Sequence, residues 1–322
     1  MKRLWNSVTL AVLLFILVPL DARAGELLIP VGKVIGLQLS DSTVTVAAFD
    51  DVLGTAAREA GLRIGDEIVT VGGQQIGCAE DIRLALSSCG SPVELTVRRS
   101  GKTHTLHMSP SDTGDGRRLG IYLRQGITGI GTVTWYDPDS GTFGTLGHGV
   151  SGPKGELLNM TEGLAFDAQV ISIKKGKAGE PGQLKGTAEL PKSCGRLLRN
   201  TPQGVFGISR EGWPGEPLPV ADYDDIQTGP ATIRSTVAGE TPQEYSVEIL
   251  KIYPEDRCDN RNFLLKVTDP ELLAETGGIV QGMSGSPIIQ DGKLVGAVTH
   301  VLVNDPTRGY GIFIENMLTA AS

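Results

Sequence analysis

Glycine and proline punctuate this sequence and limit what it can fold into. The 322 residues include 43 glycines and 18 prolines, which divide the chain into many short apolar segments. Both residues interrupt regular helices, whereas short strands joined by turns accommodate them between segments. The sequence therefore predicts a mainly β protein. Its length exceeds one ordinary compact core, so we expect two domains.

The N-terminus has the features of an export signal. Lys2 and Arg3 supply positive charge, residues 8–20 are apolar, and residues 22–24 offer small side chains for cleavage. The apolar run is shorter than the roughly 20 residues that a membrane-spanning helix needs. We expect residues 1–24 to act as a signal peptide or a retained signal anchor, which places the rest of the protein outside the cytoplasm.

Charge and cysteine spacing exclude several classes of protein. The formal net charge is −8, and no stripe of Lys and Arg with interleaved aromatic residues suggests nucleic-acid binding. Export permits disulfides, so Cys78 could pair with Cys89 and Cys194 with Cys258, with free thiols as the alternative. No cysteine or histidine spacing is typical of a metal site, and we expect neither metal nor cofactor.

Residues 26–110 form a first predicted unit of short strands and two short helices, the second over 79–88. The spacing Ala-x-x-Ala-Gly-Leu-x-x-Gly-Asp-x-Ile, at positions 57–68, resembles the PDZ domains attached to bacterial proteases. PDZ domains bind an extended peptide at a sheet edge beside a helix. The resemblance implies that backbone N–H groups of Ile35, Gly36 and Leu37 hold a peptide carboxylate, with the 79–88 helix opposite. A PDZ fold that acts only as a spacer is the alternative.

Residues 111–118 are polar and rich in Gly and Asp, which predicts a linker. From residue 119 to residue 322, short apolar segments recur between turn residues. Examples are 131–135, 168–173, 205–208 and 245–252. Many short strands over about 200 residues are typical of one barrel or two paired barrels.

The hexapeptide Gly-Met-Ser-Gly-Ser-Pro at 282–287 is the first indication of chemistry. A serine becomes a nucleophile when a base accepts its proton and a tight turn exposes its hydroxyl. The flanking glycines permit such a turn, and the N–H groups of Gly282 and Ser284 could then stabilise an oxyanion. By itself the hexapeptide could equally be an ordinary Gly–Ser turn.

The base must be one of four histidines. His104 and His107 lie in a predicted hairpin, where exposed polar positions explain them. His148 lies between two glycines, which gives it no obvious role in a core and favours catalysis. His300 follows Ser284 by 16 residues on a predicted strand. It could be the base, a core residue or a substrate-pocket residue, and we favour the pocket.

A third group should orient the imidazole of the base. Asp269, in Thr-Asp-Pro, is one candidate, although this tripeptide is often only a turn. Spacing alone leaves the choice open. The other candidates are the acidic patch Asp222, Asp224 and Asp225 and, less favoured, Asp167 and Asp259.

Further blocks that combine glycine with apolar residues lie at 119–122, 129–132, 146–149, 182–186, 200–201, 204–207 and 282–318. In this order they resemble the SpoIVB-type sporulation peptidases, serine proteases of the chymotrypsin-like clan with an N-terminal PDZ domain. The resemblance implies a chymotrypsin-like double β-barrel after the PDZ domain. It also implies that His148 and Ser284 are catalytic, and it favours Asp269 as the third member. Met283 departs from the aspartate found there in many chymotrypsin-like enzymes, which implies a different activation route.

The resemblance also implies a biological role. Such a peptidase is exported from the forespore into the space between forespore and mother cell. There it cuts itself and cleaves a regulatory membrane-protein partner of an intramembrane protease, which leads to sigma-factor activation. Protein or peptide substrates and PDZ-bound peptide termini are the expected partners.

Two other functions compete with proteolysis. One is a PDZ adaptor whose protease-like domain is catalytically silent. The presence of both His148 and Ser284 argues against it, because a decayed protease would be expected to lose one of them. The other is an esterase or acyl transferase. The sequence lacks the GxSxG turn that such enzymes place between a strand and a helix.

Overall fold

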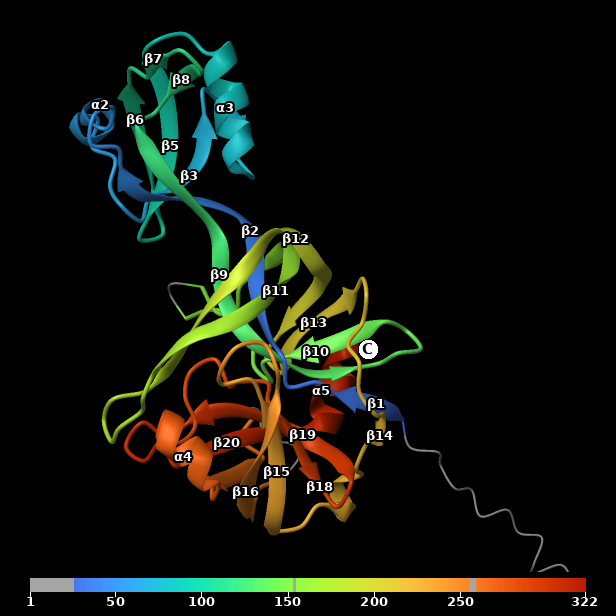
Figure 1. The fold of residues 1–322 in the computed structure, drawn as a ribbon. Coiled ribbons are helices and arrows are strands. Elements are labelled where there is room, and N and C mark those ends of the chain that lie inside the picture. Colours follow the sequence, from blue (N-terminus) through green and yellow to red (C-terminus); the bar gives the residue numbers. More distant parts are fainter. Residues whose placement is uncertain (1–25, 153–154, 255–258) are drawn as a thin grey trace, which may run out of the picture.

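The computed structural model describes residues 26–152, 155–254 and 259–322. It confirms a mainly β protein, built from the unit predicted to be a PDZ domain and two closed β-barrels (Figure 1). Within these ranges, no helix has both the length and the apolar character needed to cross a membrane. The predicted export signal at 1–24 lies outside the described residues.

Six antiparallel strands close the first barrel, because β2 pairs with β9 as well as with β11. In ring order they are β2 (Val34–Phe49), β9 (Ile121–Tyr136), β10 (Thr142–Thr145), β13 (Gly204–Ser209), β12 (Gln183–Thr201) and β11 (Met160–Lys174). Ile35, Val133, Phe143 and Leu197 belong to its core. The short strands β1 (Leu27–Pro30) and β14 (Leu218–Pro219) extend the sheet beyond β9.

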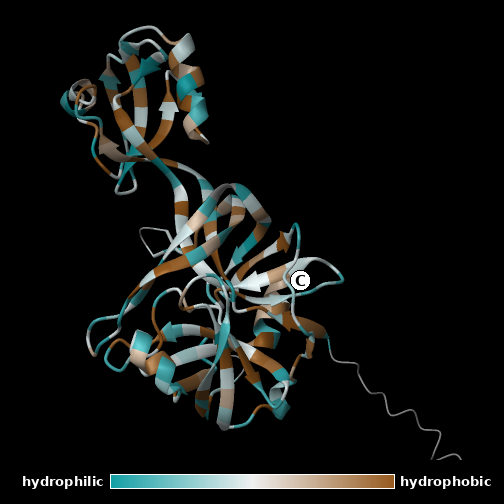
Figure 2. Ribbon diagram, viewed as in Figure 1, coloured by the Kyte–Doolittle hydropathy of each residue, from teal (hydrophilic) through white to brown (hydrophobic). Residues whose placement is uncertain are grey.

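The second barrel is compact and closed by six strands of its own. They are β15 (Gly229–Ser235), β16 (Gln243–Ile252), β17 (Phe263–Val267), β20 (Arg308–Phe313), β19 (Lys293–Val301) and β18 (Pro287–Gln290). Along β17 the buried Phe263, Leu265 and Val267 alternate with less buried residues, as expected for a strand with one face in a core. Figure 2 shows similar alternation of hydrophobic and hydrophilic residues along other strands.

In the described part of the chain, three helical segments accompany the barrels. A single 3-10 turn, η1 (Tyr223–Asp225), precedes β15, and α4 (Pro270–Thr276) follows β17. The C-terminal helix α5 (Ile314–Ala321) packs where the two barrels meet. Its Met317 shares a buried cluster with Trp135 and Phe206 of the first barrel and Ala297 of the second. The barrels are therefore joined by a common apolar core as well as by the chain.

The PDZ domain lies at the far end of β2 and β9, which run side by side out of the first barrel (Figure 1). Its separate core includes Val44 and Val46 of β2, Ile68 and Leu95. Its other elements are α2 (Thr55–Glu59), β3 (Glu67–Val71), β4 (Gln74–Gln75), α3 (Ala79–Ser88), β5 (Val93–Arg99), β6 (Lys102–Met108), β7 (Ser111–Thr113) and β8 (Gly116–Arg118).

The predicted boundary between the two units is wrong at its N-terminal side. Strand β1 and residues 34–39 of β2 lie in the first barrel, where β2 pairs with both β11 and β9. The PDZ domain is therefore inserted between two strands of the peptidase and does not simply precede it. A barrel strand and a PDZ strand have the same alternation of side chains, so the sequence pattern could not separate the two halves of β2.

The predicted linker at 111–118 is also wrong. These residues form the β7–β8 hairpin, which packs against the PDZ helix α3. The guanidinium of Arg117 donates hydrogen bonds to the carbonyl oxygens of Leu86 and Cys89. Because the last carbonyls of a helix lack partners within the helix, this arginine stabilises the end of α3.

The suggested Cys78–Cys89 disulfide is excluded by helix geometry. Cys78 is the N-cap and Cys89 the C-cap of α3. At 1.5 Å per residue, their Cα atoms are about 16 Å apart, whereas a disulfide needs about 7 Å or less. Cys78, Cys89 and Cys194 are free thiols. Cys258 lies outside the described residues.

Candidate active site

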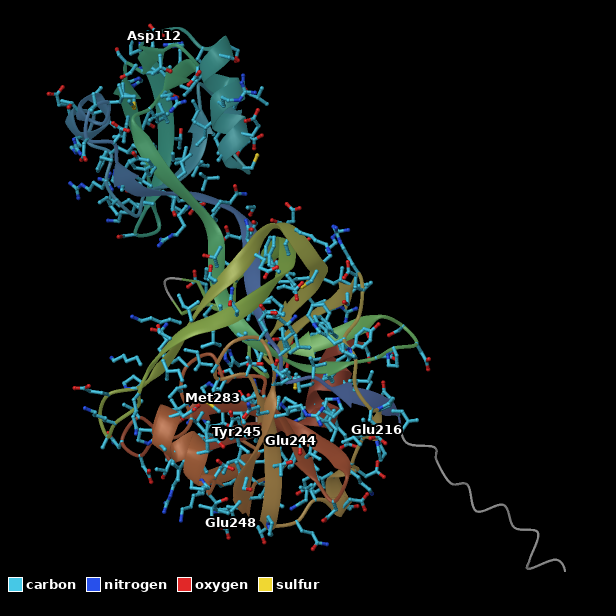
Figure 3. All side chains as sticks on the ribbon, in the orientation of Figure 1. Asp112, Glu216, Glu244, Tyr245, Glu248 and Met283 are labelled. Carbon is cyan, nitrogen blue, oxygen red and sulfur yellow. The ribbon has the colours of Figure 1, made fainter. Side chains whose placement is uncertain are left out.

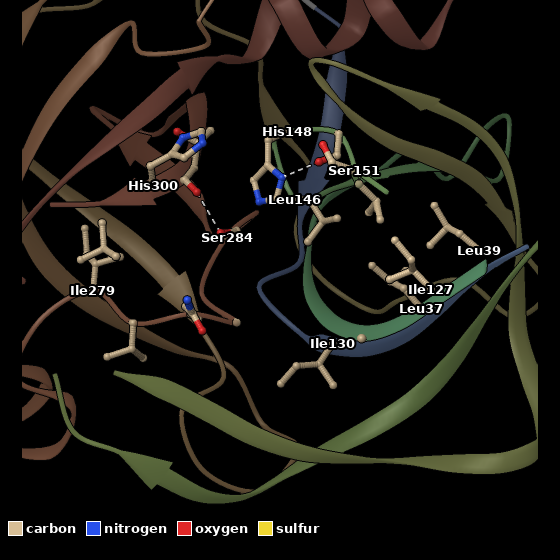
Figure 4. A pocket seen from close by; sticks show the side chains of 18 residues that line it. Leu37, Leu39, Ile127, Ile130, Leu146, His148, Ser151, Ile279, Ser284 and His300 are labelled. Carbon is tan, nitrogen blue, oxygen red and sulfur yellow. Dashed lines mark hydrogen bonds between the residues drawn. The ribbon is translucent and has the colours of Figure 1, made fainter. Parts of the chain in front are cut away.

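A cavity of about 500 Å³ opens between the two barrels and contains both predicted catalytic side chains (Figure 4). Strands β2 and β9 and the loop after β10 form one wall, and residues 279–284 with β19 form the other. Among the described residues that line it, none is Asp, Glu, Lys or Arg. The aliphatic lining residues are Leu37, Leu39, Ile127, Ile130, Leu146, Val150, Ile279, Val280 and Val301.

His148 is held in a tight loop after β10. Its glycine neighbours are required, because a Cβ on Gly147 would lie 2.9 Å from the Thr299 methyl carbon. A Cβ on Gly149 would lie 2.6 Å from the backbone carbonyl oxygen of Thr201. This close packing explains why the sequence places glycine on both sides of the histidine.

The imidazole of His148 has a defined tautomer. Its Nδ1 lies 2.9 Å from the carbonyl oxygen of Gly149. A carbonyl only accepts hydrogen bonds, so Nδ1 carries the proton and Nε2 is left as a proton acceptor. In Figure 4, Nε2 faces the side of the cavity where Ser284 lies. Burial lowers the pKa of His148 below its usual value, which keeps the ring neutral, although the Gly149 hydrogen bond opposes this shift.

Ser284 lies at the turn that the Gly-x-Ser-Gly pattern predicts. Gly282 and Gly285 both have positive φ, at 101° and 96°. A Cβ on Gly285 would approach the carbonyl oxygen of Thr132 to 2.1 Å, so only glycine fits there. The hydroxyl of Ser284 donates a 2.9 Å hydrogen bond to the carbonyl oxygen of Thr299.

Thr132 of β9 anchors this turn to the first barrel. Its hydroxyl donates to the carbonyl oxygen of Gly282 at 2.8 Å, and its N–H donates to that of Ser284 at 3.1 Å. One residue of the first barrel therefore holds the nucleophile of the second in place.

The backbone around Ser284 presents two N–H groups without partners among the described residues. The N–H groups of Met283 and Gly285 are bonded to Val280 and Val298, whereas those of Gly282 and Ser284 are not used. The carbonyl oxygen of Gln281 accepts from Leu184, and that of Met283 accepts from Ser286. In a trans peptide the N–H points opposite to the C=O. The Gly282 and Ser284 N–H groups are thus turned away from these contacts and are available to an oxyanion.

Met283 packs inward between these two residues. Its side chain is fully buried in the core of the second barrel (Figure 3). An apolar contact therefore occupies the position where many chymotrypsin-like enzymes have an aspartate.

His300 lines the same cavity from β19, as its predicted pocket position requires. Its ring centroid is 5.5 Å from that of His148. Burial, reinforced by His148, lowers the pKa of His300 to about 4, so both rings are neutral at neutral pH. Its Nδ1 is buried and has no hydrogen-bond partner within the described ranges.

The structure does not bring Asp269 to His148. One carboxylate oxygen of Asp269 accepts from the N–H groups of Glu271 and Leu272, each at 3.0 Å. The other carboxylate oxygen accepts from the backbone N–H of Ser246 at 3.3 Å. Asp269 is the N-cap of α4, with proline at the first helical position, which is a common way to begin a helix. In this structure Asp269 therefore caps a helix, and its role as the third catalytic residue stays a prediction.

The rival carboxylates do not line the cavity either. Asp225 pairs with Lys293 at 2.6 Å, beside Asp222 and Asp224 in the η1 segment. Asp167 pairs with Lys33 at 2.7 Å. The charge of Asp259 raises the pKa of His300, but burial and His148 lower that pKa by more. Within the described ranges, the residue that bonds to the His148 ring is thus Gly149, through a backbone carbonyl that no sequence motif identifies.

The predicted PDZ groove is misplaced. Residues 35–37 are buried in the first barrel, paired on both sides. A second cavity, of about 250 Å³, lies between α3 and the start of β9. Its lining includes Ile82, Arg83, Leu86, Arg117, Arg118, Leu119, Gly120, Ile121 and Leu123. The predicted helix at 79–88 does form one wall.

The Leu-Gly-Ile sequence at 119–121 repeats the apolar-Gly-apolar pattern of residues 35–37. Arg117 and Arg118 precede residues 119–121, and these two charges are the sequence feature that could have distinguished this segment from residues 35–37. One edge of β9 at 121–124 pairs with β2, and no strand in the described part of the chain pairs with the other. That free edge is where a peptide strand can add.

Comparison with known proteins agrees with this architecture. Residues 115–318, well over half of the chain, match the family described as SpoIVB peptidase S55. The chain belongs to the SpoIVB peptidase S55 family. Residues 33–109 match the PDZ domain family. The protein is therefore a serine peptidase with a PDZ domain and a chymotrypsin-like fold. Within the described ranges, no three His, Cys, Asp or Glu side chains are grouped to hold a metal ion.

Two curated relatives match a short part of the chain. The Agrobacterium fabrum protein named "Putative zinc metalloprotease Atu1380" is 36% identical over 90 residues, which are 28% of this chain and 23% of that protein. The Bartonella henselae protein named "Putative zinc metalloprotease BH06270" is 31% identical over 90 residues, 28% of this chain and 25% of that one. The chain thus spans about a quarter of the length of these relatives.

Among solved structures, the chain is similar to the Rv3671c protease of Mycobacterium tuberculosis. The active form has a TM-score of 0.35 and 14% identity, over 62% of this chain and 73% of that one. The inactive Ser343Ala mutant has a TM-score of 0.34 and 15% identity, over 61% and 82%.

Proposed function

We propose that this protein is an exported serine endopeptidase that cleaves extended, uncharged segments of protein substrates, including its own chain. One observation carries the proposal. His148 and Ser284 lie in one aliphatic cavity together with two N–H groups that have no partner among the described residues. A cavity without charged side chains favours apolar or small residues around the scissile bond, because burying a charge without a partner is costly.

The reaction follows from the geometry of the cavity. The Ser284 hydroxyl turns from the Thr299 carbonyl toward Nε2 of His148 and attacks the scissile carbonyl carbon while Nε2 takes its proton. The oxyanion is stabilised by the N–H groups of Gly282 and Ser284. His148 then donates the proton to the leaving amine, and water hydrolyses the acyl-enzyme by the same steps. The Gly149 carbonyl takes the orienting role that an aspartate has in other enzymes.

The PDZ groove is proposed to select the substrate. Arg118 beside the 119–123 edge is exposed and paired with Asp115 at 3.3 Å, and it suits a peptide with a terminal or side-chain carboxylate. The family supports a role in sporulation signalling between forespore and mother cell. There the protein would cleave a regulatory membrane-protein partner in the intermembrane space and so promote sigma-factor activation. The predicted export signal agrees with this location.

Intact-mass spectrometry of the purified full-length protein tests the proposal. We expect the wild type to cleave itself over time and Ser284→Ala to stay intact. Ser172→Ala is a matched control, because Ser172 is exposed on β11 and does not line the cavity, and it should cleave as the wild type does.

Cleavage of Ser284→Ala at the same sites would assign the activity to another protease. If folded wild type and mutant both stay intact and neither cleaves PDZ-bound peptides, the catalytically silent adaptor becomes the better function. The peptide released by the wild type would also report whether the residues around the cut are uncharged.

A further inference from the structure

Among the described residues, the group bonded to Nδ1 of His148 is the backbone carbonyl of Gly149, and one side chain fixes the direction of that carbonyl. We propose that Asn200, at the end of β12, is a positioning residue of the peptidase reaction. It aims the Gly149 carbonyl at Nδ1 of His148 and so maintains the tautomer that can accept the serine proton.

Asn200 makes three hydrogen bonds to backbone groups of the loop that follows His148. Its Oδ1 accepts from the N–H of Val150 at 2.9 Å. Its Nδ2 donates to the carbonyl oxygens of Val150 and Leu158, each at 2.8 Å. An asparagine side chain has two donor hydrogens and an acceptor oxygen, so Asn200 uses both donors. Because both segments of the loop are tied to one side chain, its conformation depends on that residue.

The contact with Val150 sets the direction of the Gly149 carbonyl. The C=O of Gly149 and the N–H of Val150 belong to one planar trans peptide group, in which they point in opposite directions. Fixing the Val150 N–H on Asn200 therefore turns the Gly149 oxygen the other way, where Nδ1 of His148 lies 2.9 Å from it. The amide of Asn200 thus acts on the imidazole through a single peptide plane.

Thr201, the last residue of β12, and Pro202, which follows it, support the same arrangement. The N–H of Gly149 donates to the carbonyl oxygen of Pro202 at 3.2 Å. A Cβ on Gly149 would lie 2.6 Å from the carbonyl oxygen of Thr201. Glycine lets the two backbones approach, but it also leaves the 149–150 peptide free to rotate if its hydrogen bond is lost. Asn200 supplies the restraint that this glycine cannot.

The chemical consequence concerns one proton. While the Gly149 carbonyl accepts from Nδ1, the neutral ring must leave Nε2 unprotonated. If the peptide rotates, Nδ1 loses its acceptor and the ring can carry its proton on Nε2, where it cannot accept the proton of Ser284. In triad enzymes a buried aspartate keeps the ring proton on Nδ1. Here Asn200 and the Gly149 carbonyl keep it there together.

Nuclear magnetic resonance of the histidine ring nitrogens tests this proposal directly. The chain has four histidines, so ¹⁵N-histidine labelling gives few signals, and substituting His148 assigns its own. In full-length Ser284→Ala protein we expect His148 to be protonated on Nδ1. In Ser284→Ala with Asn200→Ala we expect this signature to change to the Nε2–H form or to a mixture.

Kinetics of the active enzyme provide the second readout. With Ser284 present, Asn200→Ala should lower kcat by about 10²-fold and leave KM almost unchanged, because it misplaces the base and not the substrate. Asn200→Asp keeps the acceptor for the Val150 N–H and should retain more of the Nδ1–H form than Asn200→Ala. Asn262→Ala is the matched control: Asn262 also ties backbone groups together, at Pro254 and Phe313, but in the second barrel. It should lower stability without changing the His148 tautomer.

Two results would overturn the proposal. One is an unchanged His148 tautomer in folded Asn200→Ala protein. The other is a kcat within about two-fold of wild type at a temperature where the variant is folded. If Asn200→Ala does not fold, Asn200→Ser replaces it, because a serine hydroxyl is too short to reach Val150, and the same two results apply. The tautomer is measured without any activity, so failure of the proposed endopeptidase function would not be mistaken for failure of this inference.

Discussion

The two barrels each supply half of the active site, but they hold their halves differently. In the second barrel the Ser284 turn is fixed by a short regular network, in which Met283 is buried and its carbonyl accepts both the N–H and the hydroxyl of Ser286. In the first barrel His148 lies in a longer loop whose direction depends on Asn200. The nucleophile is thus positioned largely by its own turn, with Thr132 of β9 as an anchor, and the base by a side chain from a strand distant in sequence.

The barrels also differ in what their strands do beyond the site. The second barrel closes on itself, whereas β2 and β9 of the first continue into the PDZ domain. Along β9, residues 121–123 line the PDZ groove, residues 127–130 contribute to the catalytic cavity, and Thr132 bonds to the Ser284 turn. The first barrel is therefore the part through which peptide binding and catalysis are connected. Substitutions in the first barrel are expected to reduce activity without abolishing it, except at His148, whose loss removes the general base.

The largest expected effect separates the two histidines of the cavity. His148→Gln should lower kcat/KM by about 10⁴-fold or more, because it removes the general base. His300→Gln should leave most of kcat and alter the preferred cleavage sites, since His300 lines the cavity without a bond to Ser284. Peptide-library cleavage with steady-state kinetics measures both. Equal losses of kcat would show that the second barrel also supplies a base.

The second prediction breaks the contact between the barrels at Thr132. Thr132→Val keeps the shape but removes the hydroxyl that donates to Gly282, at a net cost of about 1 kcal/mol, or about five- to tenfold in kcat. We expect KM to change little, and kcat and KM are measured on a short peptide substrate. Thr236→Val removes a comparable buried hydroxyl, which donates to the carbonyl oxygen of Gly32 and does not line the cavity, and it should change stability alone. Unaltered kcat in Thr132→Val would mean that the turn needs no support from β9.

The third prediction concerns the PDZ end of β9. Arg118→Glu should weaken binding of peptides with a terminal carboxylate by about tenfold, because it reverses an exposed charge at the groove. Lys102→Glu, a charge reversal on the β5–β6 turn that does not line the groove, is the control. Fluorescence anisotropy with labelled peptides measures both affinities. Equal affinities for the two variants would place the binding site elsewhere.

The pH dependence follows from the histidine of the first barrel. Burial lowers the pKa of His148, and the base must be neutral to act. The acid limb of kcat/KM should therefore have its midpoint below about pH 6.5, the ordinary pKa of histidine. In the unfolded chain His148 has its ordinary pKa and takes up a proton as pH falls below about 6.5, whereas the buried ring takes it up only at lower pH. The free energy of unfolding should therefore also decrease as pH falls below about 6.5. A midpoint above pH 7 would indicate a carboxylate beside the imidazole.

The smallest expected effect on activity is at Asp269. Asp269→Ala removes the N-cap of α4 and should lower the free energy of unfolding by about 1 kcal/mol, while Asp269→Asn should keep most of it. Urea unfolding measures the stability, and kcat/KM should stay near wild type in both. A severe loss of kcat/KM in a folded Asp269→Asn protein would restore the triad implied by the family resemblance.

The sequence by itself determined the mainly β fold, the PDZ and peptidase units, and the positions of His148 and Ser284. These features depend on short-range chemistry: glycines that permit tight turns reveal themselves within a few residues of the catalytic side chain. Family resemblance added the double barrel. It also favoured Asp269 among the candidate aspartates, and in this structure that residue is the N-cap of α4.

Only the tertiary structure decided that the PDZ domain is inserted between β2 and β9, and that its groove lies at 119–123 and not at 35–37. Alternating apolar residues are alike in a barrel strand and in a PDZ strand, so pairing partners far along the chain make the difference. The same holds for the group that orients His148. A backbone carbonyl has no sequence signature, and its direction is set by Asn200, 50 residues from Val150, through contacts that exist only in the folded barrel.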